Sequence, residues 1–181
     1  MNAEALLTKH FGAAGHACSI VLEHSRLVAA KALRVAHSLG DPTLDLRFIE
    51  EAALLHDIGV CRTRSTGIGC SGDAPYILHG IIGREILESE GLHRHALVCE
   101  RHIGVGLTAD DILRQGLPLP PRDMAPLSRE EIIICFADLF FSKKPAMLRQ
   151  EKSCDEVRRN LGKFGEHKVT IFEQWLQEFA V

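Results

Sequence analysis

The chain has 181 residues, of which 46% are hydrophobic, and its 21 lysines and arginines against 24 aspartates and glutamates give a formal charge of −3. This length and apolar content suit one domain, over residues 1–181, with a single core, and the charge lacks the basic excess of most nucleic-acid-binding proteins. Because no apolar run reaches the ~18 residues that cross a bilayer, and MNAEALLTKHFG lacks the basic-then-apolar order of a signal peptide, we expect a cytoplasmic protein that binds neither nucleic acid nor membrane.

The six cysteines are scattered without a CxxC pair, and most lie in apolar, helix-like segments. This pattern is typical of buried reduced thiols and not of a disulfide framework. The ten histidines are many for this length, and several fall inside apolar helical patterns. We therefore look for function first among the histidines.

The first predicted helix covers residues 15–39. Its apolar residues recur at spacings of three and four, and the Gly-Asp-Pro sequence at 40–42 ends it. His24 lies four residues after Ile20 and three before Leu27, so it shares their face and should point inward.

The second predicted helix covers residues 44–58 and contains the stretch EEAALLHDIGVC. Gly59 is expected to act as a left-handed cap at its end. Asp57 then lies in or just after the last turn, where a carboxylate opposes the helix dipole at a cost of a few tenths of a kcal/mol. A metal ion bound by His56 and Asp57 would remove that conflict.

Two segments are predicted to be irregular loops. Residues 62–75 are rich in glycine, serine and threonine, and residues 104–128 contain four prolines. Loops of this length often form the lids or walls of a site, so we expect both to shape a substrate pocket.

The remaining segments are predicted to be helical. They cover residues 76–91, 92–103, 127–141 and 154–179, and Gly162 and Gly165 are positions at which the last of them could break. The sequence shows no internal repeat and no alternating strand pattern of useful length. The predicted fold class is all-α.

Five of these helices offer an inward-facing ligand type: His24, the pair His56 and Asp57, His79, His102 and Asp138. Burying so many polar groups without partners would cost several kcal/mol, whereas first-row divalent metals accept imidazole and carboxylate together. Successive helical residues differ by about 100°, so His56 and Asp57 could reach one ion. The second oxygen of Asp57 could then bind another.

With these residues in place, the chain resembles the HD-domain metal-dependent phosphohydrolases, in the subgroup whose motif is HDIG. EHSRLVAAKALRVA around His24 is similar to the first ligand helix of that family, LLHDIG at 54–59 to its name-giving motif, and CFADLFFSK around Asp138 to its final aspartate. LHGIIG and ERHIG resemble the extra ligand segments of dinuclear members, including the YqeK-type enzymes that cleave diadenosine tetraphosphate symmetrically. The resemblance implies an HD/PDEase-like helical bundle with a metal-site core at about 15–145 and a helical extension at about 150–181.

The resemblance also implies the ligands and the reaction. It assigns His24, His56, Asp57 and Asp138 to one ion and His79 and His102 to a second, with Asp57 bridging. Iron is the first choice of metal, and manganese, cobalt and zinc are the alternatives. The implied reaction is hydrolysis of a phosphate ester or anhydride of a small, nucleotide-like molecule by a metal-bound hydroxide.

One departure from the family pattern concerns the residue that binds phosphate. Many relatives read HDIGK, whereas this chain has Val60 after the glycine. Guanidinium and ammonium groups near the ligands are the replacements to consider: Arg62, Arg64, Arg84, Arg101 and Lys143. We expect Arg101, beside His102, and Lys143, one turn beyond Asp138, to act in catalysis with Asp57. Glu100 is a residue that could orient a ligand imidazole.

Two other functions fit the same ligands. A di-iron oxygenase of this fold would act on a small polyol or phosphonate, and a sensor would bind metal or nucleotide without turnover. The likeness of LLHDIG and LHG to nucleotide hydrolases favours hydrolysis. A homodimer could form through the apolar ending WLQEFAV. The other histidines are expected to be surface or structural residues: His10, His16, His37, His93, His95 and His167.

Overall fold

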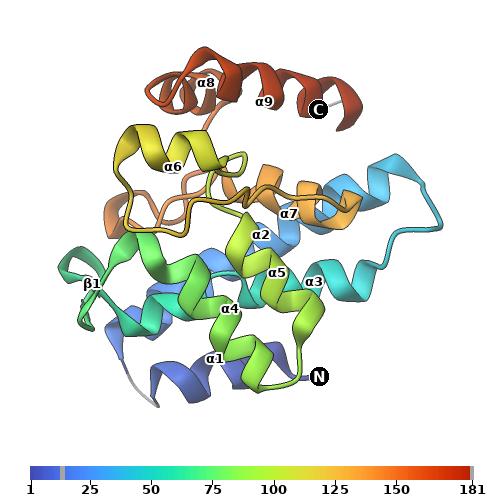
Figure 1. Cartoon of the computed structure of the whole chain (residues 1–181). Helices are drawn as coiled ribbons and strands as arrows, with labels where there is room; N and C mark the ends of the chain where they lie inside the picture. The colour runs from blue at the N-terminus through green and yellow to red at the C-terminus, as the bar shows by residue number, and fades with distance from the viewer. Residues whose placement is uncertain (13–14, 180–181) are drawn as a thin grey trace.

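The computed structural model describes residues 1–12 and 15–179 and consists mainly of helices (Figure 1). The all-α fold class is confirmed. The α-helices are α1 (Ala3–Phe11), α2 (His16–Leu39), α3 (Leu46–Leu55), α4 (His79–Ser89), α5 (His93–Arg101), α6 (Ala109–Gln115), α7 (Arg129–Asp138), α8 (Cys154–Gly162) and α9 (Glu166–Phe179). Short 3-10 helices join some of them: η1 (Ile58–Arg62), η2 (Thr66–Ile68), η3 (Tyr76–Leu78) and η4 (Pro145–Met147). Within the described ranges, no helix is long and apolar enough to span a membrane.

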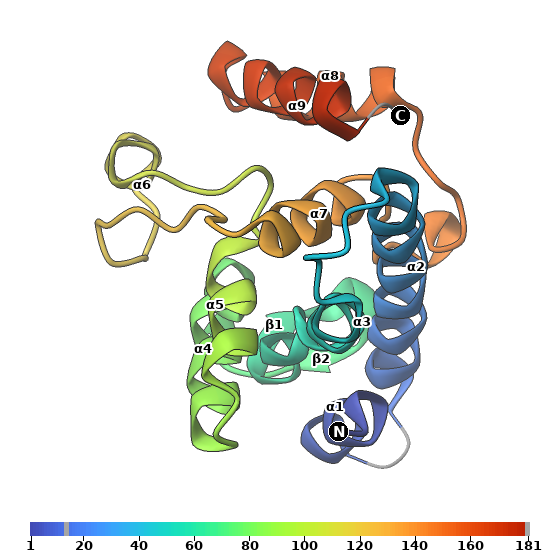
Figure 2. The ribbon, with the colours of Figure 1, turned by 90° about the vertical axis from the view of Figure 1, so that its right-hand side faces the viewer.

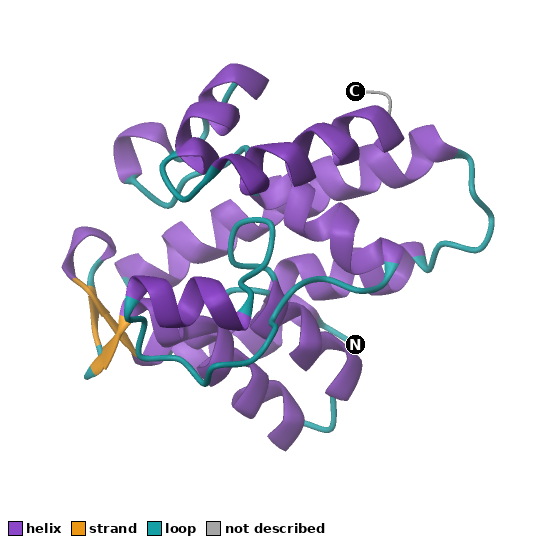
Figure 3. Cartoon of the chain, turned by 45° about the horizontal axis from the view of Figure 1, so that its top comes forward, coloured by secondary structure: helices purple, strands orange, loops and turns teal. Residues whose placement is uncertain are grey.

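The segment at 62–75, predicted to be an irregular loop, contains three very short strands at one edge of the molecule (Figure 3). They are β1 (Thr63–Ser65), β2 (Cys70–Ser71) and β3 (Ala74–Pro75), in the order β2-β1-β3. The strand β1 pairs antiparallel with β2 and parallel with β3. Strands of two or three residues are too short to leave an alternating apolar pattern in the sequence.

The predicted second helix is interrupted where the HD pair lies. Helix α3 ends at Leu55, and a 3-10 helix begins at Ile58. Gly59 does not adopt the left-handed conformation expected of a cap. Instead, a Cβ atom at this position would collide with the carbonyl oxygen of His79 and the backbone nitrogen of Gly83. The glycine therefore lets η1 lie directly against α4.

The sequence-based prediction missed one helix inside a predicted loop, and it correctly placed a break in the closing helix. Helix α6 lies within residues 104–128 and begins with a capping box between Thr108 and Asp111. Its seven residues are too few to show a helical period. The closing helix at 154–179 is interrupted as expected, since Gly165 has a φ of 129° and separates α8 from α9.

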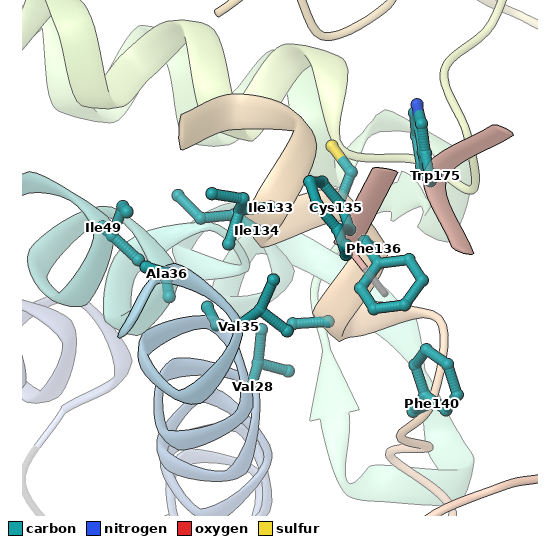
Figure 4. Packing of buried hydrophobic residues seen from close by; sticks show 14 of the residues in the cluster. Val28, Val35, Ala36, Ile49, Ile133, Ile134, Cys135, Phe136, Phe140 and Trp175 are labelled. Atoms are coloured by element: carbon teal, nitrogen blue, oxygen red, sulfur yellow. The ribbon is translucent and has the colours of Figure 1, made fainter. Parts of the chain in front are cut away.

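The helices α3 and α7 form a central pair that other helices flank. In Figure 2, α2 lies on one flank, α4 and α5 lie on the other, and α3 and α7 lie between them, with α8 and α9 beyond α7. The largest apolar cluster joins α2, α3, α7, α8 and α9 (Figure 4). A second cluster joins α1, the start of α2, η1, α4 and α5. Leu54 packs against both clusters. His56 and Asp57 therefore follow closely after a residue that contacts both apolar clusters.

Phe136 lies at the centre of the larger cluster. Its ring lies 5.1 Å from Phe140, 5.8 Å from Phe172 and 5.1 Å from Phe179. The apolar face of α9 thus packs inward, and Trp175 is only 7% exposed. A homodimer through this face stays a prediction.

Candidate metal centre

The six residues predicted as ligands lie in one cluster, although their metal binding stays a prediction. Most of them occupy the ends of helices, and those ends converge. His24 is inside α2, His56 is the C-cap of α3, Asp57 precedes η1, His79 begins α4, His102 follows α5, and Asp138 ends α7. All except Asp138 are at most 5% exposed. The side chain of Asp138 is 17% exposed, so the cluster opens to solvent on that side.

Backbone carbonyls orient three of the imidazoles. The Nδ1 atoms of His56, His79 and His102 each lie 2.6–2.8 Å from the carbonyl oxygen three residues earlier. Because a carbonyl can only accept, each Nδ1 carries the proton and donates it. Nε2, which faces the cluster, is then the nitrogen that carries the lone pair in the neutral form of each ring.

The two oxygens of Asp57 face different histidines. Its Oδ2 lies 2.9 Å from Nε2 of His56 and 3.3 Å from Nε2 of His24. Its Oδ1 lies 3.6 Å from Nε2 of both His79 and His102. This division suits a carboxylate that bridges two ions through its two oxygens.

Asp138 completes the first of these groups. Its Oδ1 lies 2.9 Å from Nε2 of His24 and 3.6 Å from Nε2 of His56. The donor atoms of His24, His56 and Asp138 all lie within 4.8 Å of one another, and so do those of His56, Asp57 and His102. Such spacings are compatible with ligands around a common ion.

The hydrogen-bond inventory of the cluster fits a cation. Among the described residues, Nε2 of His24 and of His56 and both oxygens of Asp57 are buried and make no well-directed hydrogen bond, although they lie close to one another as ionisable groups. In addition, Nε2 of His79 and of His102 are 3.1 Å apart, and their lone pairs would repel. Divalent transition-metal ions would resolve both problems, because imidazole and carboxylate are among their preferred ligands.

Lys143 is the basic residue that the structure brings to the cluster. Its Nζ lies 2.6 Å from Oδ2 of Asp57, and its side chain is 15% exposed. Burial opposes its charge, but Asp57 and Tyr76 raise its pKa, so the ammonium form persists. The structure thus places one of the predicted catalytic cations next to the predicted bridging ligand.

Tyr76 is a residue near the centre that the sequence did not indicate. Its ring stacks on His79 at 4.7 Å and 27°, and its carbonyl accepts the bond from His79 Nδ1. Burial raises the pKa of its hydroxyl, and the nearby Lys143 partly offsets that rise. The only signal was an aromatic residue three positions before a ligand-type histidine.

The predicted catalytic role of Arg101 gains no support from its contacts. Its guanidinium donates to both carboxylate oxygens of Glu131, at 3.0 and 3.2 Å. Arg84 is similarly engaged, at 2.8 Å from Glu88 and 2.6 Å from Glu100. These arginines bind carboxylates outside the cluster, whereas Lys143 lies inside it, beside Asp57. Lys143 is therefore the better candidate for contact with phosphate.

Glu100, for which orienting a ligand imidazole was one possibility, binds arginines instead. Its carboxylate accepts hydrogen bonds from Arg84 and Arg122, and this joins helices α4 and α5 to the segment before α7. Arg64, one of the basic residues considered for phosphate, is exposed and lies 3.9 Å from Asp73. Sequence proximity to a ligand thus did not predict either side chain's direction.

Lowering the pH below 6.5 is expected to destabilise the metal-free protein through His79. Burial and the neighbouring His102 lower the pKa of His79 from 6.5 to about 3, so the unfolded chain takes up a proton before the folded chain does. The contribution of His79 to the free energy of unfolding is complete above pH 6.5. Below that pH it falls by up to about 1.4 kcal/mol per pH unit. His56 shifts oppositely: burial opposes its charge, but Asp57 and Asp138 raise its pKa to about 10, so its contribution changes only above pH 6.5.

Urea unfolding of chelator-treated protein at pH 6.5 and 5.5 measures this loss. The matched variant His79→Asn lacks the titrating imidazole and should lose less stability between the two pH values. Burial also lowers the pKa of His95, but this residue acts equally in both proteins and cancels in the comparison. An equal loss in the two proteins would contradict the assignment to His79.

Comparison with known proteins relates this cluster to one family. The family model of the HD domain matches residues 21–141, a range that includes all six clustered residues. An uncharacterized protein of Methanocaldococcus jannaschii is 37% identical over 128 residues, which cover 68% of this chain and 68% of that protein. No solved structure gives a significant match.

Two tRNA (cytidine(56)-2'-O)-methyltransferases are also similar. The protein of Thermoplasma volcanium is 29% identical over 170 residues, which cover 90% of this chain and 46% of the enzyme. The protein of Picrophilus torridus is 33% identical over 124 residues, which cover 68% of this chain and 32% of the enzyme. The chain therefore spans less than half the length of each of these two relatives.

Proposed function

The chain belongs to the HD-domain family of metal-dependent phosphohydrolases, and on that premise we propose that it hydrolyses a phosphate ester or anhydride of a small, nucleotide-like molecule. The observation that carries the proposal is the division of the Asp57 oxygens between two groups of histidines. In this proposal His24, His56, Asp57 and Asp138 hold one divalent ion, and His79, His102 and Asp57 hold a second. Iron is the first choice, and manganese, cobalt and zinc are the alternatives.

When bound, such ions supply an activated water and neutralise charge on the phosphoryl oxygens. The residues of the chain prepare the site for this chemistry. The carbonyl contacts of His56, His79 and His102 hold a proton on each Nδ1, so Nε2 is the nitrogen that each ring would offer to a metal. Burial opposes the charge of His56, but Asp57 and Asp138 raise its pKa to about 10, so metal binding would displace a second proton from its Nε2. Lys143 stands as an ammonium beside Asp57, where it can bind a phosphoryl oxygen and offset its charge. The partly exposed side of Asp138 gives the substrate its approach.

The methyltransferase relatives do not lead us to propose methyl transfer. The chain matches less than half of each of those enzymes, so the activity in their name does not have to reside in the matching part. The buried imidazole and carboxylate groups suit metal ions. We therefore propose hydrolysis at this cluster and no methyl transfer.

Metal content and phosphate release from the same anaerobic preparation test the proposal. Elemental analysis should find two transition-metal ions per chain. The same protein should release phosphate or a nucleotide, without oxygen, from at least one member of a nucleotide panel that includes diadenosine tetraphosphate. Treatment with a chelator should abolish release, and addition of manganese or iron(II) should restore it.

The alternatives give different results in this experiment. A di-iron oxygenase would contain two irons, release nothing from any phosphate, and consume oxygen with a polyol or phosphonate. A sensor would bind metal or nucleotide without forming product. A protein that binds no metal under any loading condition would contradict all three functions.

A further inference from the structure

A cavity lies between the segment after His102 and the two carboxy-terminal helices. It has a volume of about 220 Å³, and its lining includes residues of α6, α8 and α9. Figure 1 shows α6 next to the α8–α9 pair. Pockets that take a whole drug-sized ligand measure roughly 300–1,000 Å³, so this one suits part of a substrate. Its wall is almost wholly apolar and is formed chiefly by Ile77, Ile103, Gly104, Leu117, Leu161 and Phe164. We call it the α6–α9 cavity.

The α6–α9 cavity lies beside the side of the candidate metal centre that Asp138 forms. A second cavity, lined by Asp138, shares Gly104, Leu161 and Phe164 with it. Ile103, which follows the predicted ligand His102 in the chain, lines the α6–α9 cavity itself. A phosphate at the metal centre could therefore carry a group that extends into the α6–α9 cavity.

The walls of the cavity are held in place by buried contacts. The Nζ of Lys168 donates to the carbonyl of Gly106 at 2.7 Å and to Asp111 at 2.5 Å. Both side chains are at most 5% exposed. These contacts fix α9 to α6 and to the segment before α6, and they occupy the ammonium of Lys168. The cavity is thus a formed, apolar site and not a second anion site.

Phe164 indicates what the cavity accepts. It lies in the turn between α8 and α9, and it is 54% exposed, unlike the other phenylalanines of those helices, Phe172 and Phe179. An exposed aromatic ring at the rim of an apolar cavity offers a face on which a planar ring can stack. Gln115, also in the lining, offers an amide that can both donate to and accept from the edge of such a ring. A nucleobase has both features.

This part of the site lies partly outside the matched family segment. The HD match ends at residue 141, whereas Leu161, Phe164 and Lys168 come from α8, α9 and the turn between them. The carboxy-terminal helices thus add a wall to a site whose ligand-type residues all lie within the match.

We propose that the α6–α9 cavity binds the nucleobase of the substrate, stacked on Phe164, while the phosphate lies at the candidate metal centre. This inference rests on the proposed function for the identity of the phosphate site. It adds the prediction that the base is recognised by the carboxy-terminal helices, through residues that have no part in the metal cluster.

Binding of matched probes by calorimetry to the metal-loaded full chain tests this inference. The probes are the four common ribonucleosides, the phosphonate analogue of AMP, in which carbon replaces the ester oxygen, and methylphosphonate, which lacks the base. Phe164→Ala removes the stacking face, and Leu117→Trp fills the cavity. Leu113→Ala is the control, because Leu113 is a 68% exposed residue of α6 and does not line the cavity.

At least one nucleoside and the AMP analogue should bind the wild type, with Kd values about tenfold or more higher in Phe164→Ala and Leu117→Trp. Methylphosphonate should bind all variants equally, and Leu113→Ala should bind every probe like the wild type. Three results would overturn the proposal: no nucleoside binding, equal losses for the AMP analogue and methylphosphonate in the two cavity variants, or methylphosphonate binding to the wild type as tightly as the AMP analogue. Base-dependent binding without hydrolysis of any nucleotide would leave the cavity assignment intact and remove the proposed function instead.

Discussion

The substitution Asp57→Asn is expected to remove both metal ions and to lower kcat/KM for phosphate release by at least about a thousandfold. The amide keeps the size of the side chain, but it lacks the charge and one of the two acceptor oxygens that face His56 and His102. Metal ions contribute several kcal/mol to charge stabilisation in such reactions, and each 1.4 kcal/mol corresponds to a factor of ten in rate. Elemental analysis and a phosphate-release assay on one preparation give both quantities.

The control for this variant is Asp73→Asn. Asp73 has a fully exposed side chain, so its amide should leave metal content and turnover unchanged. Circular dichroism checks that Asp57→Asn is folded before its activity is compared. Two bound ions with wild-type turnover in Asp57→Asn would refute the bridging role.

Replacing Phe136 by alanine is expected to lower the free energy of unfolding by about 3–5 kcal/mol. Phe136 is 0% exposed and joins α7 to α9 through Phe172 and Phe179. Proteins of this size are stable by only about 5–15 kcal/mol, so the melting temperature should fall by roughly 6–20 °C. Urea and thermal unfolding of the metal-free protein measure the loss.

Phe164→Ala is the matched control, because it removes the same ring from an exposed position and should cost less than about 1 kcal/mol. We propose that α8 and α9 fold together with the HD-matching segment as one unit. Phe136→Ala then shifts a single transition, seen equally by far-ultraviolet circular dichroism and by the fluorescence of Trp175. The opposite result is a fluorescence change of Trp175 that comes earlier than an unshifted transition in circular dichroism. It would show that the extension folds independently.

The cluster could be predicted because its residues conflict with their surroundings in the sequence. His24 lies on an apolar helix face, and Asp57 lies where a helix dipole disfavours a carboxylate. Such unfavourable placements are expected when a favourable interaction, such as metal binding, offsets their energetic cost. Helical periodicity then indicated that the polar side chains point inward, and the structure brings them together.

The surroundings of the cluster could not be predicted in the same way. Arg101 finds its carboxylate partner thirty positions away at Glu131, and no local pattern encodes such a distance. The direction of Glu100 was missed for the same reason, since both its arginine partners lie on other segments. Helix α6 was missed because a single capping box cannot distinguish a short helix from a turn.

The close contact at Gly59 changes what the HDIG motif means as a search pattern. Its histidine and aspartate supply donor atoms, but its glycine is required because the backbone of α4 leaves no room for a methyl group. Gly83 faces it and is itself closely packed against Cys99. A search that demands the glycine therefore selects chains with this helix contact, whatever reaction they catalyse. Chains with the same donor atoms but a wider helix spacing would escape it.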